Sequence, residues 1–414
     1  MNEAKQKFRL TSLERAWILY DVGNSAFVLL VATLIPIFFN ALAEGGGLSS
    51  VEYLAYWGYA ASAVTVITAV LSPILGTLAD TRNFKKPIFT FCVAVGVIGC
   101  CAMGMASTWL PFLLIFIFAK VGFSGSLVFY DSMLSDVTVP DRMDEVSSKG
   151  YAWGYIGSCV PFVVCLALVL GAGSVGISQM TALNLALFIT AAWWLVTTLP
   201  LLRQYKQVHF VEVQEHAIRQ SFARIGHTLR HLKEDRQVFW FLLAFFCYID
   251  GVYTIIDMAT AYGTALGLDT TGLLLALLVT QIVAFPSALV FGRLSGQYPS
   301  GTLIPVCIAA YAGIALFAFF LKHQWQFWVL AVVVGMFQGG IQALSRSHFA
   351  KIIPPEKSGE YFGLFDICGK GASFLGTMIV SVGSQLTGSA NVGVGSLIVL
   401  FIVGFVLFRV SDQK

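Results

Sequence analysis

The chain has 414 residues, of which 57% are hydrophobic and 11% are charged, and its mean hydropathy is +0.80. This composition excludes an ordinary soluble domain. The formal net charge of +3 comes from basic residues dispersed along the chain rather than gathered on one element, so we expect no nucleic-acid partner. The composition indicates a protein embedded in a lipid bilayer.

Twelve apolar runs occupy most of the chain. A run of about 20 apolar residues crosses a bilayer as a helix, because only internal hydrogen bonding satisfies the backbone there. The predicted spans, in chain order, are 16–41, 52–76, 87–106, 110–134, 150–171, 179–202, 237–261, 271–292, 302–321, 325–345, 359–383 and 390–408. The predicted fold class is therefore an all-α membrane protein with twelve transmembrane helices in two halves of six.

The basic residues fall into every second gap between these spans, and the alternate gaps contain Lys322 alone. By the positive-inside rule, both termini are cytoplasmic. Residues 26–39, followed by Ala41-Leu42-Ala43, also resemble a signal peptide. Removing them would leave an odd number of spans, so we expect a retained first span. We place the chain in the plasma (inner) membrane as a multi-pass protein.

The longest gap divides the twelve spans into two sets of six. We expect an N-terminal bundle over 1–202, a cytoplasmic linker over 203–236 and a C-terminal bundle over 237–414. Apolar residues recur in the linker at helical spacing with basic residues between them, which is typical of an amphipathic helix on a lipid surface. A solvated tether between two bundles explains the pattern equally well. The apolar positions are Ile218, Phe222, Ile225, Leu229 and Leu232.

The two halves share a sequence order. Val139-Pro140 and Ile353-Pro354, about 214 residues apart, each follow a span and precede a charged loop and a glycine-rich helix. Two six-span halves built as a repeat place a substrate site at their interface, near the bilayer midplane. The repeat therefore predicts a transporter-like architecture.

A loop between the second and third spans carries a more specific resemblance. The segment from Gly76 to Lys86, GTLADTRNFKK, resembles the G-x-x-x-D-(R/K)-x-G-(R/K)-(R/K) signature of the major facilitator superfamily. It departs from the signature with Thr81 and Phe84 at basic positions and with Asn83 in place of the glycine. Asparagine tolerates the left-handed backbone conformation that a glycine would take, so that replacement is compatible with the loop.

Four further strings resemble the vacuolar-effluxer-like branch of that superfamily, which includes the fungal autophagy-related vacuolar amino-acid effluxer. They lie at 14–27, 248–256, 281–286 and 339–347. The resemblance covers essentially the whole chain. It implies the twelve-helix facilitator fold, solute transport by alternating access and, through the fungal member, amino-acid export.

Charged residues inside the spans are the candidates for function, because each costs of order 2.5–3.5 kcal/mol on insertion scales. In the fold that the resemblance implies, spans one, four, seven and ten line the central cavity. The residues predicted to bind substrate or protons lie on these spans: Asp21, Asn24, Lys120, Asp250, Tyr253, Asp257, Gln338 and Gln342. The residues predicted to gate the protein or to act as structural charges are Asp80, Arg82, Lys85, Asp131, Asp366 and Lys370.

Lys120 and Asp250 lie near mid-membrane in opposite halves, so they need each other, a substrate or a proton. Lysine offers a compact cation for a carboxylate. Asp250 or Asp257 could hold an ammonium group or carry a proton. These charges predict a small zwitterion such as an amino acid as substrate, with protons as the coupling ion. The resemblance implies export as the direction, although the fold permits import as well. Asp21 has two open interpretations, as part of this site or, together with Asp131, as part of a cytoplasmic gate.

Other classes of protein fit less well. The gaps are too short for a catalytic domain and contain no G-x-x-x-x-G-K-(S/T) phosphate loop, so we expect neither an enzyme nor an ATP-driven pump. The eight cysteines form no C-x-x-C pair and have no nearby histidine, so we expect no metal and no cofactor. The alternatives that remain are an exporter of lipophilic drugs or lipids and a non-transporting receptor on the same fold.

Overall fold

The computed structural model describes residues 8–212, 230, 232 and 234–412, apart from the side chains of a few helical positions, among them 370–374. Eleven segments of this part of the chain are long and apolar enough to cross a membrane, and α14 completes the twelve predicted crossings. The crossing segments are α1 (Ser12–Ala32) continued by α2 (Leu34–Gly45), α3 (Ser50–Ala79), α4 (Lys85–Met103), α5 (Trp109–Ser132), α7 (Pro140–Leu170), α8 (Gln179–Gln204), α10 (Arg236–Ala265), α11 (Thr270–Leu294), α12 (Ser300–Ala318), α13 (Gln324–Ile352), α14 (Ser358–Thr387), and α15 (Ala390–Gly395) continued by α16 (Ile398–Asp412).

The first crossing begins earlier than hydropathy predicts and is broken in the middle. Thr11 and Glu14 form a capping box that starts α1 at Ser12. The helix breaks at Thr33, where φ is −129° and ψ is −73°. Pro36 follows three residues later; it has no backbone N–H to donate and its ring crowds the carbonyl of Ala32. Polar and proline signals, rather than apolar length, thus set these boundaries.

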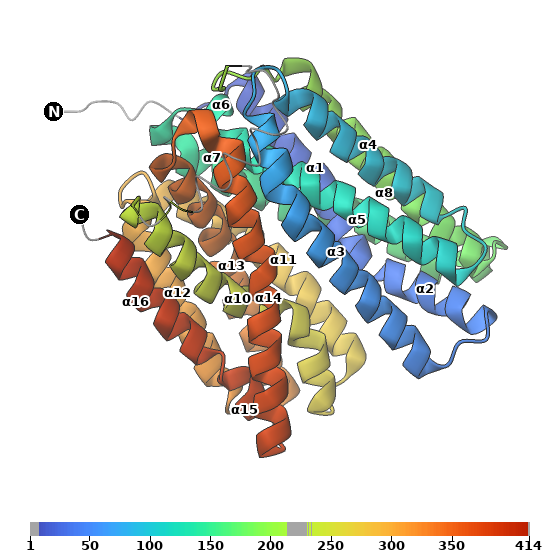
Figure 1. Ribbon diagram of the computed structural model, residues 1–414. Coiled ribbons are helices and arrows are strands. Elements are labelled where there is room, and N and C mark those ends of the chain that lie inside the picture. Colours follow the sequence, from blue (N-terminus) through green and yellow to red (C-terminus); the bar gives the residue numbers. More distant parts are fainter. Residues whose placement is uncertain (1–7, 213–229, 231, 233, 413–414) are drawn as a thin grey trace.

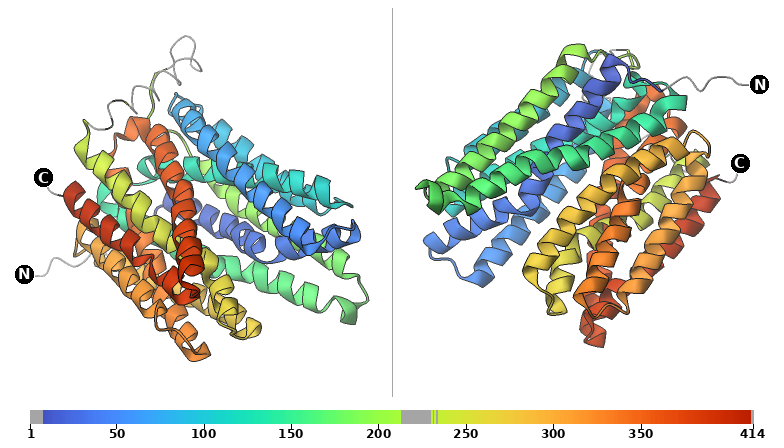
Figure 2. Two further views of the ribbon diagram at one scale, coloured as in Figure 1. Left: turned by 60° about the horizontal axis from the view of Figure 1, so that its bottom comes forward. Right: turned by 180° about the vertical axis from the view of Figure 1, so that it is seen from behind.

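The helices form two halves. Within the first half, α1 packs against α7 and α8, and α4 packs against α5. Within the second half, α11 packs against α13, and α10 packs against α14 and α16. The halves meet where α3 lies along α14 and where α7 lies along α11 and α13, and Figure 2 shows the two halves from two further directions.

Contact between the halves is concentrated at one end of the molecule. We call this end the terminal face, because α1 begins and α16 ends there. Figure 1 shows the halves close together at the terminal face, beside α6 (Leu134–Val137) and the start of α7, and diverging toward the far ends of α3 and α14. The structure therefore presents a state in which the terminal face is closed.

The internal repeat has a counterpart in two matching hydrogen bonds. In the first half, the hydroxyls of Tyr20 on α1 and Ser126 on α5 lie 2.6 Å apart. In the second half, the hydroxyls of Tyr248 on α10 and Ser345 on α13 lie 2.7 Å apart. Each pair is buried and ties the first helix of its half to the fourth crossing of that half. The helix predicted around 218–232 in the linker lies outside the described residues, apart from 230 and 232.

Candidate functional site

An arginine from the second half occupies the centre of the closed interface. Arg346, near the end of α13, is 2% exposed. Its guanidinium donates a hydrogen bond to the Asp131 carboxylate over 3.0 Å and lies 3.7 Å from the Asp21 carboxylate. It also donates to the hydroxyl and the carbonyl oxygen of Ser147, over 2.9 and 3.1 Å. We call Arg346, Asp21 and Asp131 the arginine cluster; it joins α13 to α1 and α5.

Aromatic rings surround this guanidinium. Its central carbon lies 4.7 Å from the ring centre of Trp17, 5.3 Å from that of Tyr130 and 4.3 Å from that of Tyr151. The Trp17 indole donates to the carbonyl of Tyr130 over 2.9 Å, which fixes the first two rings relative to each other. Cation–π attraction is strongest when the cation is desolvated, so these rings stabilise a buried guanidinium.

The sequence analysis did not identify Arg346 as a site residue, because it counted this residue among the basic residues of the loops. A signal was present, since Gln338, Gln342 and Arg346 recur every four residues and share one face of α13. The structure brings Asp21 and Asp131 together around that arginine. Asn24 is buried beside them, and its amide donates to the carbonyl of Tyr20 over 3.0 Å.

A second ion pair crosses the interface next to the arginine cluster. Lys351 of α13 lies 2.6 Å from the carboxylate of Asp144 on α7. The hydroxyl of Ser347 donates to the same carboxylate over 2.6 Å. This pair, which the sequence analysis also missed, has one cation for one carboxylate.

The loop after α3 makes the third polar contact between the halves. Asp80 accepts hydrogen bonds from the backbone N–H groups of Gly359 and Glu360, over 2.7 and 2.8 Å. These groups lie in the first turn of α14, where backbone donors have no partner within the helix and the helix dipole favours an anion. Asp80 therefore caps a helix of the opposite half. Its loop turns at Asn83 with a φ of 64°, as the asparagine in the signature position predicts.

Lys85 completes this contact. Its ammonium group is fully buried and donates to the Ser358 hydroxyl over 2.9 Å, while it lies 3.9 Å from Asp80 and 3.6 Å from Asp136. The prediction grouped Arg82 with these residues, and here the structure differs: Arg82 is exposed and pairs with Glu212 at 3.4 Å. We call the contact among Asp80, Lys85 and the start of α14 at 358–360 the latch.

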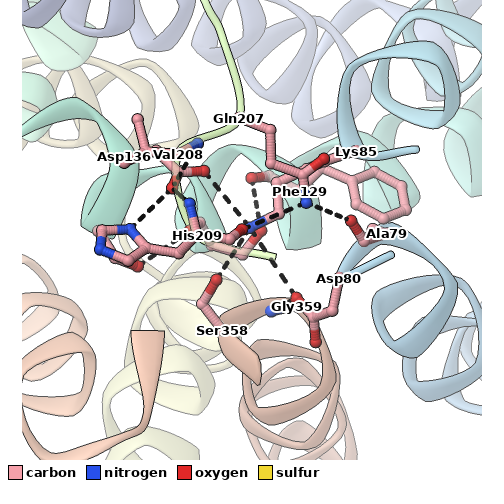
Figure 3. Close-up of polar contacts among 12 residues, drawn as sticks. Ala79, Asp80, Lys85, Phe129, Asp136, Gln207, Val208, His209, Ser358 and Gly359 are labelled. Carbon is pink, nitrogen blue, oxygen red and sulfur yellow. Dashed lines mark hydrogen bonds and ion pairs between the residues drawn. The ribbon is translucent and has the colours of Figure 1, made fainter. Parts of the chain in front are cut away.

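The start of the linker is bound to the latch. We call residues 205–212 the strap, and Figure 3 shows how its middle part lies across Asp136 and Lys85. The Tyr205 hydroxyl and the backbone N–H of His209 donate to the Asp136 carboxylate over 2.5 and 2.9 Å. The Val211 N–H donates to the carbonyl of Asp80 over 2.7 Å. At this end the linker is therefore bound to the first half by hydrogen bonds and does more than connect the two halves.

Asp136 and His209 titrate abnormally because they bind each other. The hydrogen bond to Asp136 raises the pKa of the His209 imidazole. Burial alone would raise the pKa of Asp136, but the hydrogen bonds from His209 and the charge of Lys85 outweigh burial and hold that pKa below its usual range. The strap therefore binds most strongly with an anionic Asp136 and a cationic His209.

Deeper in the membrane, Lys120 interacts with Asp257, one of the two aspartates that the sequence suggests for this site. Lys120, in the middle of α5, lies 4.7 Å from the ring centre of Phe123 and interacts electrostatically with Asp257 of α10. Asp257 is exposed, and Lys120 is half-buried. Groups of opposite charge from opposite halves therefore act on each other in the membrane-spanning part of the protein.

Asp250, the other aspartate that the sequence suggests for this site, faces its own half. It is fully buried, and its Oδ1 accepts hydrogen bonds from the Gly376 N–H over 2.9 Å and the Thr254 hydroxyl over 3.3 Å. Asp250 and Asp257 share a face of α10, two turns apart. At the level of Asp250 the helix α14 covers this face, whereas the Asp257 side chain is exposed.

The remaining predicted residues lie along the same interface. The Tyr155 hydroxyl of α7 donates to Gln342 of α13 over 3.0 Å, and Gln338 is buried one turn away. Tyr253 is half-buried on α10. Asp366 accepts a hydrogen bond from Ser72 of the first half over 2.7 Å, and the side chain of Lys370 is outside the described part of the chain.

Metal ligands are not grouped in this structure. Among the described residues, no three His, Cys, Asp or Glu side chains are placed to hold a metal ion together. The eight cysteines carry free thiols, and most are buried.

Comparisons with known proteins agree on the type of protein. The family model described as "Vacuole effluxer Atg22 like" matches residues 12–141 and 135–414. The chain is 42% identical over 411 residues to the "uncharacterized MFS-type transporter YxiO" of Bacillus subtilis, covering 98% of this chain and 96% of that protein. It is 25% identical over 315 residues to autophagy-related protein 22 of Coccidioides immitis, and it spans 51% of the length of that fungal relative.

Solved structures share the fold at low sequence identity. The human organic anion transporter MFSD10 superposes with a TM-score of 0.72 at 13% identity, covering 96% of this chain and 98% of the other. The transporter FucP in its outward conformation also gives a TM-score of 0.72, at 17% identity, with 97% and 98% covered. The chain therefore belongs to the Atg22-like vacuole effluxer family, a branch of the major facilitator superfamily of transporters.

Proposed function

We propose that this transporter exports a small zwitterion, with an amino acid as the first candidate, by alternating access coupled to protons. The observation that carries the proposal is that Lys120 on α5 and Asp257 on α10, groups of opposite charge, lie on membrane-spanning helices of opposite halves and act on each other electrostatically. An ammonium and a carboxylate at this depth are costly unless each is compensated. A zwitterion compensates both, with its carboxylate at Lys120 and its ammonium at Asp257.

The position of this pair suits alternating access. Substrate sites in transporters with repeated halves lie at the interface of the halves. Asp257 is exposed, whereas the arginine cluster and the latch close the interface toward the terminal face. We propose that the bundles at 1–202 and 237–414, joined by the linker at 203–236, rock about this site as units.

The direction follows from the charge pattern and from the relatives. The basic residues support a cytoplasmic terminal face, and we propose the plasma membrane as the location of the protein, so that the closed terminal face leaves the site open to the outside. The matching family is described as vacuole effluxers. Efflux from a compartment is the activity in that description, and we propose that in this protein it takes the form of export from the cytoplasm.

Counterflow in proteoliposomes tests the transport of amino acids. Wild type should exchange labelled amino acids across the bilayer, and Lys120→Met should lose this exchange while it keeps its thermal stability. Lys322→Met is the matched control, because Lys322 is exposed in a loop and its loss should leave exchange unchanged. Amino-acid exchange by Lys120→Met at the wild-type rate would contradict the proposal.

A lipophilic solute is the second candidate, because the second half contains an apolar pocket. About 560 Å³ of empty space, part of it open to solvent, is lined by side chains of α10, α11, α13, α14 and α15, among them Met258, Tyr262, Phe327 and Leu330. If lipophilic cations rather than amino acids stabilise the purified protein, and Met258→Trp removes that effect, this pocket becomes the substrate site.

A further inference from the structure

We infer that the arginine cluster is the proton-binding site of the transport cycle, and that protonation of its acidic pair, Asp21 and Asp131, releases Arg346 and opens the terminal face. The inference rests on the proposed alternating access and names the site of its coupling ion. It is carried by the arrangement of three charged groups at the closed interface.

The charges of the cluster do not balance. Among the described side chains, two carboxylates share one guanidinium, so one negative charge is left over in a buried place. The Oδ2 atom of Asp21 lies 3.7 Å from Arg346, and no described atom donates a hydrogen bond to it. Two carboxylates that share a site bind a proton more readily than a single one, because the proton relieves their repulsion.

One member of the cluster is open to water. The side chain of Asp131 is 21% exposed, compared with 9% for Asp21 and 2% for Arg346. Protons therefore reach the cluster through Asp131. The other titratable groups that act on the acidic pair are Tyr20 of α1, Tyr130 of α5, Tyr151 and Tyr155 of α7, Tyr253 of α10 and Asp366 of α14.

These neighbours add no further cation. The tyrosines are neutral at physiological pH, and Asp366 brings one more acidic group. Arg346 is therefore the group whose departure changes the charge balance of the acidic pair most strongly. Its position on α13, in the half opposite to both carboxylates, makes its distance from them depend on the conformation of the transporter.

Opening the terminal face separates Arg346 from Asp21 and Asp131. A carboxylate without its arginine holds a proton more tightly, so the open state binds the proton better than the closed state. A ligand that binds one state better shifts the population toward it, and acidification should therefore favour the open terminal face. Loss of one charge-assisted hydrogen bond corresponds to a shift of roughly tenfold in the ratio of open to closed molecules.

The neighbouring pair of Asp144 and Lys351 is the matched control. It crosses the same interface and Asp144 is buried, but it has one cation for one carboxylate. Breaking this pair should weaken the closed state at every pH. It should not remove the response to acid.

Hydrogen–deuterium exchange of the full-length protein in nanodiscs tests the inference without any substrate. The peptides to follow are those from the first half of α7 and the last half of α13, at neutral and acidic pH, after correction for the intrinsic exchange rate. In wild type they should exchange about tenfold faster at acidic pH. In Asp131→Asn they should exchange fast at both pH values, whereas Asp131→Glu and Asp144→Asn should keep the response to acid.

Two results would overturn the inference: a wild type whose exchange does not respond to acid, or an unchanged response in both Asp131→Asn and Asp21→Asn. Asp21→Asn serves as the second variant if Asp131→Asn fails to fold. The outcome is separate from that of the counterflow assay. A response to acid without amino-acid exchange would reject the proposed substrate and keep the proton site, and the reverse result would reject the site alone.

Discussion

Arg346 of the second half donates a hydrogen bond to Asp131 of the first half over 3.0 Å, across the closed end of a twelve-helix transporter. This contact links a charge on α13 to charges on α5 and α1. Arg346 moves with the second half, whereas Asp131 and Asp21 move with the first half. It therefore reports the conformation of the protein directly. The Asp144–Lys351 pair closes the same face with one cation for one carboxylate.

Removal of the guanidinium should destabilise the closed protein strongly. In Arg346→Met two carboxylates remain buried without their cation, and loss of one partner of a buried ion pair costs about 3–5 kcal/mol. Thermal unfolding of the purified variant should show this loss. Arg346→Lys should recover only part of it, because lysine keeps the charge but not the planar fork of donors.

The control for this variant is Arg409→Met, which removes an exposed arginine near the end of α16. It should change the free energy of unfolding little. An equal loss of unfolding free energy in Arg346→Met and Arg409→Met would mean that the arginine cluster does not stabilise the closed state.

Asp80→Asn should loosen the latch. The amide keeps one acceptor oxygen but loses the second, and it loses the negative charge that faces the first turn of α14, which is worth about 0.3–1 kcal/mol and up to ~2 kcal/mol when partly buried. Because the cap joins the two halves, deuterium exchange at the start of α14 should rise. Asp269→Asn makes the same change at a cap within a single half, where Asp269 accepts from Gly272 over 2.7 Å, and should leave exchange at α14 unchanged.

Gly359→Ala should prevent the close approach of α3 and α14. A Cβ atom at this position would collide with the carbonyl oxygen of Gly76 and lie 2.7 Å from the Asp80 carboxylate. Overpacking of this kind costs roughly 1–3 kcal/mol. Gly313→Ala is the control, since nothing lies within 4 Å of its added Cβ and alanine favours a helix by about 0.5–1 kcal/mol. Thermal unfolding should therefore move in opposite directions in the two variants.

The strap should contribute stability that depends on pH. The hydrogen bond to Asp136 raises the pKa of His209 above its ordinary value of about 6.5. This contribution is fully present below that value and is lost as the pH rises through the raised pKa of the folded state. The difference in melting temperature between wild type and His209→Gln should therefore shrink from mildly acidic to alkaline pH.

The contribution of Asp136 to stability depends on pH in the opposite direction from that of His209. Its pKa is lowered in the folded state, so its contribution is present above the ordinary value for aspartate and is lost only as the pH falls through the lowered value. Asp136→Asn should therefore reduce stability throughout the neutral range. A His209→Gln difference that grows toward alkaline pH would contradict the assigned contact.

Hydropathy and charge predicted the crossings because apolar length and the positive-inside bias act on each span separately. The pairing of charges between the halves was harder to predict. Asp250 and Asp257 are both aspartates and lie on the same face of α10. Asp250 is buried where α14 packs against that face, whereas Asp257 is exposed. Arg346 was counted with the loops because α13 extends to Ile352, one and a half turns beyond that residue, a length that apolar content does not reveal.

The most direct test of the proposed site is a series of ligands that differ by one charge. Thermal stabilisation of the purified protein should be measured with an amino acid, its methyl ester and its N-acetyl derivative, for wild type and for Lys120→Met. If Lys120 binds the carboxylate and Asp257 the ammonium, wild type should be stabilised by the amino acid far more than by either derivative, and Lys120→Met should no longer distinguish the amino acid from its ester. Equal stabilisation of wild type by all three compounds, or the same preference in Lys120→Met, would contradict the zwitterion site.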